Sequence, residues 1–144
     1  MINLISTMII LTAIETGIPP YFALAIAYEE NWSLNPKAIH INPNGSSDLG
    51  VMQLNSSWYN GNWQDPKENI TAGCRKIKEL IDMPQTTTYW SVAICYNAGP
   101  RWLTRNEKPP DSSIDYATRV IARWNNLTGG RALTIINNKA RGNS

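Results

Sequence analysis

Two adjacent glutamates, Glu29 and Glu30, stand in the stretch AIAYEENWSLNP at residues 25–36. A carboxylic acid that protonates a leaving oxygen near neutral pH needs a raised pKa, and therefore a desolvated position in a cleft. Successive residues of a helix diverge by about 100°, so the two carboxyl groups cannot share one helix face. We therefore expect one glutamate to face a cleft or the core and the other to face water.

Most other acidic residues of the chain have simpler explanations. Asp65 is expected to cap a helix, with Glu68 at the position that completes a capping box. The candidates for acid chemistry are therefore Glu29, Glu30 and Asp48, which lies in a segment rich in turn-forming residues. Solvated or turn-bonding carboxylates remain the alternative for all three.

Composition predicts one ordinary globular domain over residues 1–144, and it argues against nucleic-acid binding and against a metal site. The net charge is only +2 and the thirteen Lys and Arg are dispersed, so nucleic-acid binding is not indicated. One histidine and two cysteines form no metal-ligand spacing, so we expect no metal and no cofactor. Cys74 and Cys95 lie on predicted apolar helix faces, where either one disulfide or two buried thiols would fit.

The aromatic residues are six Trp and six Tyr against one Phe, so nearly every ring carries a polar group. Such rings suit a carbohydrate ligand, because they offer a flat apolar face and a hydrogen-bonding edge. Packing in the core is the alternative for each of them.

The N-terminal segment predicts a first helix rather than a signal peptide. It lacks a basic start and a small-residue cleavage site, and Gly17 and Pro19 end its apolar pattern. The face expected to be buried consists of apolar residues, namely Ile2, Leu4, Ile5, Met8, Ile9 and Leu11. No apolar run is long enough to cross a membrane.

The remaining pattern predicts a mainly helical α+β fold with one small antiparallel hairpin. A second helix opens at Pro19 and Pro20 and carries the two glutamates at its C-terminal end. The hairpin is expected within 38–55, and further helices within 65–81, 86–100 and 112–127. We expect the tail beyond residue 130 to be poorly ordered.

Four blocks of sequence, in their order and spacing, carry a resemblance to a known family. They read AIAYEENW, NPKAIHINPNGSSDLGVMQLNSSW, DPKENITAG and YWSVAICYNAG. Over about residues 15–125 the chain resembles the lytic transglycosylases of the lysozyme-like superfamily, which are related to goose-type lysozyme. It is most similar to the short, specialised cell-wall enzymes of secretion, conjugation and pilus systems. The resemblance implies a lysozyme-like helical bundle whose small β-hairpin lines the substrate cleft.

A gap-free match of the helix places Glu30 on the catalytic glutamate of that family. Glu29 is then a solvated neighbour. The sequence departs from the family pattern in having Asn31 where serine is usual, and one extra residue before the Asn-Pro pair. If that insertion were shifted into the helix, Glu29 would be the match instead.

The resemblance also assigns residues to the sugar groove. Met52 and Gln53 match a pair that lines its floor, with Gln53 offering a donor and an acceptor to an N-acetyl group. Gly50 matches a glycine that lets the hairpin backbone approach the sugar. Core packing is the alternative for Met52, and Asn55 fits either hairpin structure or groove lining.

Three further groove residues come from the C-terminal half of the chain. Tyr96 and Asn97 match a pair whose polar ends approach the catalytic carboxyl group and the substrate amide. Tyr116 matches a tyrosine that closes the cleft from the last helix. Core packing is again the alternative for Tyr96.

The implied reaction is cleavage of the β-1,4 bond between MurNAc and GlcNAc in peptidoglycan, with formation of 1,6-anhydro-MurNAc. A single glutamate acts first as acid and then as base. Goose-type lysozymes carry an aspartate two residues after the matching Gln, where this chain has Asn55, and this favours transglycosylation over hydrolysis. The alternatives are a hydrolytic muramidase, with Asp48 as a second acid, and a non-catalytic cell-wall-binding component of a virion or secretion apparatus.

The expected partner is the peptidoglycan glycan strand, and the expected state is a monomer, free or docked on a secretion, pilus or phage assembly. The expected location is the periplasm or the cell-wall side, although no export signal is visible. A phage virion is the alternative location.

Overall fold

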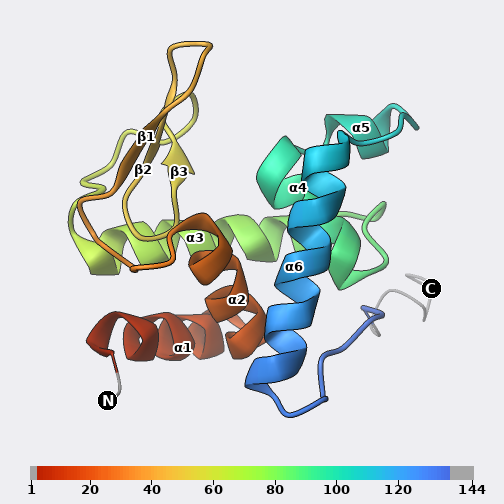
Figure 1. Ribbon diagram of the computed structural model, residues 1–144, viewed down its shortest axis with the longest axis horizontal. Helices are drawn as coiled ribbons and strands as arrows, with labels where there is room; N and C mark the ends of the chain where they lie inside the picture. The colour runs from red at the N-terminus through yellow and green to blue at the C-terminus, as the bar shows by residue number, and fades with distance from the viewer. Residues whose placement is uncertain (1–2, 137–144) are drawn as a thin grey trace. The chain divides into compact units, whose positions relative to one another are not determined.

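The computed structural model describes residues 3–136, and these form two compact units, one up to Arg75 and one from Lys76 onward. The elements of both units appear in Figure 1. Helix α3, Pro66–Asp82, runs through the boundary between them. The expectation of one domain over residues 1–144 stays a prediction.

The first unit begins with two helices that pack against each other, α1 at Leu4–Thr16 and α2 at Pro20–Glu30. Gly17 ends α1 in the left-handed region at φ 84°, and its N–H donates to the carbonyl of Ala13. Pro20 opens α2 at the first helical position, where no N–H is needed. The predicted end of α1 and the predicted start of α2 are therefore confirmed.

The buried face of α1 differs from the face that the sequence predicts. Its buried residues are Ser6, Ile9 and Ala13, whereas Leu4 and Leu11 are exposed. Because apolar residues surround most of this helix, their spacing alone does not select the packed side. Ile2, which the prediction also placed on the buried face, lies outside the described residues.

The sheet has three short antiparallel strands in the order β1-β2-β3, at Ile39–Ile41, Ser47–Leu49 and Leu54–Asn55. The first two form a hairpin within the predicted range 38–55, in which Ile39 pairs with Leu49. Its second strand, however, lies among the turn-forming residues and not in the apolar stretch that begins at Val51. The third strand, which the sequence pattern did not predict, pairs Asn55 with Asp48.

Helix α3 follows the predicted periodicity. Asp65 caps it, because its carboxylate accepts a hydrogen bond from the backbone N–H of Lys67 at 3.1 Å. Its predicted apolar positions are all buried, namely Ile70, Cys74, Ile77 and Ile81.

The second unit contains α4 at Tyr89–Ala98, α5 at Arg101–Thr104 and α6 at Asp111–Leu127. A reciprocal capping box between Thr88 and Ser91 starts α4. Helices α4 and α6 pack together, and the rings of Tyr89 and Trp124 meet edge to face at 5.1 Å. The sequence predicted α4 and α6 but not the four-residue α5.

The C-terminal segment, as far as the structure describes it, forms hydrogen bonds with the start of α4. Thr134 accepts a hydrogen bond from the N–H of Tyr89 at 3.2 Å, and the N–H of Ile136 donates to Thr87 at 3.1 Å. Ile136 is also buried. These contacts join residues 134–136 to the start of α4, and residues 137–144 lie outside the described part. The expectation of a poorly ordered tail beyond residue 130 stays a prediction.

The fold is mainly helical with a small antiparallel sheet, which is the α+β, lysozyme-like class that the sequence predicts. Cys74 and Cys95 are both buried and free, so of the two alternatives the thiols are correct. Within residues 3–136, the helices are all too short or too polar to span a membrane.

Candidate active site

Glu29 and Glu30 are the last two residues of α2, as predicted. Both side chains are half-buried, so neither fully faces water and burial does not distinguish them. Asn31 follows as the C-cap with φ −154°, which turns the chain out of the helix directly after Glu30.

Asn31 connects the end of α2 to the sheet. Its side chain is buried, and its Nδ2 donates to the carbonyl oxygens of Asn35 at 3.0 Å and Gly50 at 3.3 Å. Its Oδ1 accepts a hydrogen bond from the hydroxyl of Ser33 at 3.2 Å. The residue that departs from the family's usual serine therefore fixes the backbone next to Glu30.

Gly50 is the point where several of these contacts meet. Its φ of 76° lies in the left-handed region, and an added Cβ would lie 2.7 Å from the carbonyl oxygen of Trp63 and against the side chain of Asn69. Its N–H also donates to the carbonyl of Ala38 at 2.8 Å. The close approach observed here is to the protein's own backbone, and the predicted approach to the sugar stays a prediction.

Gln53 follows in the same turn with φ 53°, a conformation that costs a non-glycine residue on the order of 1–3 kcal/mol and is typical of functional sites. Its Nε2 donates to the carbonyls of Gly50 at 2.9 Å and Ala38 at 3.3 Å. Both amide hydrogens are therefore used within the protein. Of the donor and acceptor expected for the substrate, the acceptor Oε1 is the group that these bonds leave.

Met52 is fully buried and does not line an open groove. Its side chain packs on Gly73 of α3, where an added Cβ would come within 2.9 Å of it. Its N–H donates to Oδ1 of Asn69 at 2.8 Å, and Nδ2 of Asn69 donates to the carbonyl of Leu49 at 2.9 Å. For Met52 the core alternative is correct, and its role is to support the turn from beneath.

Asn55 and Asp48 hold the sheet together. Nδ2 of Asn55 donates to Oδ1 of Asp48 at 2.8 Å and to the hydroxyl of Ser46 at 3.1 Å. Its Oδ1 accepts from the N–H of Ser57 at 3.0 Å. Of the two alternatives for Asn55, hairpin structure is therefore the one observed, and Asp48 bonds across strands rather than within the turn.

The remaining predicted residues lie in the second unit, at the C-terminal end of α4 and in the first half of α6. Tyr96 is half-buried, Asn97 is exposed and Tyr116 is buried. The hydroxyl of Ser113 donates to Oδ1 of Asn97 at 2.7 Å, which joins the two helices. Ser113 and Tyr116 are three residues apart and share a face of α6.

The comparison with known families bears on this arrangement. Residues 7–118 match the family described as the Transglycosylase SLT domain, and this match covers most of the chain. The chain belongs to this family. The matched range contains all the predicted site residues, from Glu30 to Tyr116. No curated protein and no solved structure gives a significant match.

The SLT domain family is one of peptidoglycan lytic transglycosylases with a lysozyme-like fold. The match confirms the resemblance drawn from the four sequence blocks. Two residues with structural roles in this SLT domain were missed by sequence reasoning, namely Asn69 and Ser113, and Asn31 was noted only as a departure from the usual serine. Nothing local marks Asn69 and Ser113, because each acts through a bond to a distant part of the chain.

Metal-dependent catalysis and catalysis by a cysteine nucleophile find little support in the described part of the SLT domain. Within residues 3–136, no group of three or more His, Cys, Asp or Glu side chains is placed to hold a metal ion. Burial raises the pKa of the Cys74 thiol to about 12 and that of the Cys95 thiol to about 11. Because the thiolate is the nucleophilic form, neither cysteine is suited to attack a substrate.

Trp32 is an exposed ring close to the glutamates. It lies two residues beyond Glu30, is 69% exposed and packs on the ring of Tyr28, with 5.4 Å between the ring centroids. Such a supported, exposed indole offers a flat face to a sugar. By contrast Trp124 is buried in the core, so for this ring the core alternative is correct.

Proposed function

We propose that this SLT domain is a lytic transglycosylase that cleaves the β-1,4 bond between MurNAc and GlcNAc and leaves a 1,6-anhydro-MurNAc end. The observation that carries the proposal is the family match over residues 7–118. Support comes from the position of Glu30 at the end of α2, next to an amide that bonds the Gly50 turn. Glu30 is the residue that we assign as the catalytic acid and base.

The proposed reaction has two proton transfers on one carboxyl group. Glu30 first donates its proton to the glycosidic oxygen, and the bond from C1 of MurNAc to that oxygen breaks. The 6-hydroxyl of the same MurNAc then attacks C1 and returns its proton to the Glu30 carboxylate. The attack is intramolecular, so it benefits from a high effective concentration and consumes no water.

Other residues are proposed to bind the sugar. In the first unit, Oε1 of Gln53 would accept a hydrogen bond from the N–H of an acetamido group, and Trp32 would stack on a sugar ring. In the second unit, we propose that Tyr96, Asn97 and Tyr116 contact the substrate, as their match to the family pattern implies.

The side chains of Asn55 and Asp48 in the sheet do not support a second catalytic carboxylate for hydrolysis. A hydrolase of this kind generally needs another carboxylate to activate water or to act as nucleophile. Asn55 is an amide, and the carboxylate of Asp48 already accepts a hydrogen bond from it at 2.8 Å. We therefore infer that transglycosylation, not hydrolysis, is the reaction.

The substrate also sets the proposed location. Because peptidoglycan lies outside the cytoplasm, we propose that the protein acts in the periplasm or on the cell-wall side, or is carried there by a phage virion. We propose that it acts as a monomer on glycan strands, alone or docked on a secretion, pilus or phage assembly.

The test is clearing of purified peptidoglycan in a zymogram gel by the purified protein. We expect a clear band at the position of the chain, with an unrelated protein of similar size as the control. A protein that binds the gel-embedded peptidoglycan without clearing it would contradict the proposal and identify a non-catalytic wall-binding component.

A further inference from the structure

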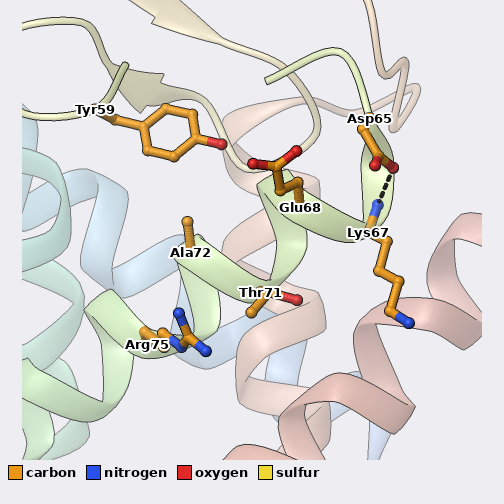
Figure 2. A pocket seen from close by; sticks show the side chains of 7 residues that line it. All are labelled: Tyr59, Asp65, Lys67, Glu68, Thr71, Ala72 and Arg75. Carbon is orange, nitrogen blue, oxygen red and sulfur yellow. Dashed lines mark hydrogen bonds between the residues drawn. The ribbon is translucent and has the colours of Figure 1, made fainter. Parts of the chain in front are cut away.

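An open groove lies between the segment that follows the sheet and one face of helix α3, entirely within the first unit. Its volume is about 330 Å³, at the small end of the range for ligand sites. Figure 2 shows the side chains that line it, namely Tyr59, Asp65, Lys67, Glu68, Thr71, Ala72 and Arg75. None of them belongs to the catalytic or sugar-binding set proposed above.

The groove presents both signs of charge along one helix face. Glu68, Thr71 and Arg75 follow each other at intervals of three and four residues, so they line one side of α3. Seven residues separate Glu68 from Arg75, which is about 10 Å along the axis. Within the described residues neither side chain forms an ion pair, so both charges are available to a ligand.

The tyrosine at the rim carries a second, independent feature. The hydroxyl of Tyr59 is buried and has no hydrogen-bond partner among the described residues. Figure 2 shows it directed toward Glu68. Burial raises the pKa of Tyr59, and the negative charges of Glu68 and then Asp65 raise it further, so the group remains an O–H donor.

The absence of a side chain at Gly61 leaves room for this hydroxyl. An added Cβ on Gly61 would lie 2.5 Å from Oη of Tyr59, so a larger residue would displace the ring. A buried hydroxyl without a partner costs stability. A ligand that accepts a hydrogen bond from this hydroxyl at the rim of the groove would satisfy it.

We propose that this groove binds the peptide stem of peptidoglycan. The stem carries amine and carboxylate groups on one short chain, and Glu68 and Arg75 lie about two helical turns apart on α3, so a short peptide presents one group to each. An ammonium group would pair with Glu68, a carboxylate with the guanidinium of Arg75, and a peptide carbonyl would accept from the hydroxyl of Tyr59. A neutral glycan would leave both charges unpaired. The identity of the ligand rests on the proposed function.

The test is a calorimetric titration of the wild-type protein with a synthetic stem tetrapeptide that contains diaminopimelate and no sugar. We expect saturable binding that weakens about tenfold in Glu68→Gln and in Arg75→Gln, because each loses one charge-assisted contact. Glu79→Gln is the matched control, since Glu79 is exposed on the same helix outside the groove, and it should bind as wild type does.

Tyr59→Phe separates binding from folding. It should weaken tetrapeptide binding while the Tm stays the same or rises, because the hydroxyl that is lost has no partner in the protein. A clear fall in Tm with unchanged affinity would show that the hydroxyl serves the fold and would overturn its assignment to a ligand.

Failure of this proposal is distinguishable from failure of the proposed function. If the tetrapeptide does not bind, or if Glu68→Gln and Arg75→Gln bind it as tightly as wild type, the groove is not a stem site even when peptidoglycan is cleaved. If the peptide binds as expected but no glycan is cleaved, the groove proposal holds and the transglycosylase proposal does not.

Discussion

The two regions that carry the proposed site residues are held in place by different forces. In the first unit, side-chain amides of Asn31, Gln53 and Asn69 bond main-chain groups around the Gly50 turn. In the second unit, α4 and α6 pack through buried side chains and the Tyr89–Trp124 contact. Directional bonds thus shape the surroundings of Glu30, whereas apolar packing positions the helix that carries Tyr96.

This difference predicts how each region responds to mutation. A hydrogen bond between a side-chain amide and a buried main-chain group is lost entirely when the amide is removed. The main-chain group then stays buried without a partner, which lowers the free energy of unfolding. A helix pair held by many small contacts loses little when one polar contact is removed. Mutations in the first region should therefore couple stability to activity, and polar mutations in the second should not.

The largest effect is expected at Glu30. Glu30→Gln should abolish lysis of peptidoglycan, because an amide cannot donate and retrieve the proton, while the free energy of unfolding stays within about 1 kcal/mol. Glu29→Gln is the matched control and should keep most of the activity. If the two phenotypes were exchanged, the catalytic assignment would move to Glu29.

Gln53→Ala and Tyr96→Phe compare the two regions directly. Each should lower turnover by a factor on the order of 10–1000, as expected for one positioned polar group at a developing charge. Gln53→Ala should also reduce stability, because the carbonyls of Gly50 and Ala38 lose a donor. Tyr96→Phe should reduce the free energy of unfolding by about 1 kcal/mol or less, because apolar packing holds its helix. Turnover is measured on soluble glycan fragments and stability by urea denaturation. Wild-type turnover in either variant would reduce that position to a packing role.

A smaller effect, on the free energy of unfolding, is expected for Asn69, whose amide bonds the Gly50 turn, and for Ser113 in the second unit. Asn69→Ala should cost about 1–3 kcal/mol of unfolding free energy, because the N–H of Met52 and the carbonyl of Leu49 lose their partner. Ser113→Ala removes a bond to an exposed amide and should cost about 1 kcal/mol or less. Equal costs in urea denaturation would contradict the contrast between the two regions.

Sequence reasoning was most successful where the signal is local. The end of α2 at Glu30, the hairpin, and helices α3, α4 and α6 follow from caps, turn residues and apolar spacing. The buried face of α1 did not, because the helix is apolar on most sides and tertiary packing decides which side is covered.

The roles of single residues were harder to predict for the same reason. The resemblance placed Met52 and Gln53 on the floor of the sugar groove, but only the fold shows that Met52 is buried and that the Gln53 donor is used internally. Asn69 was missed because its bonds reach residues 17 and 20 positions away. Pairing of Ile136 beside the start of α4 is likewise a long-range contact that no local pattern reveals.

The central claim is that Glu30 works without a second carboxylate, and the chemical nature of the product tests it most directly. Purified peptidoglycan is digested with the wild-type protein, and the released muropeptides are analysed by mass spectrometry before and after borohydride treatment. The account predicts 1,6-anhydro ends, each lighter by one water than the reducing-end counterpart and unchanged by borohydride. Predominantly reducible ends would contradict it, and would make the protein a muramidase with Asp48 as the first residue to re-examine.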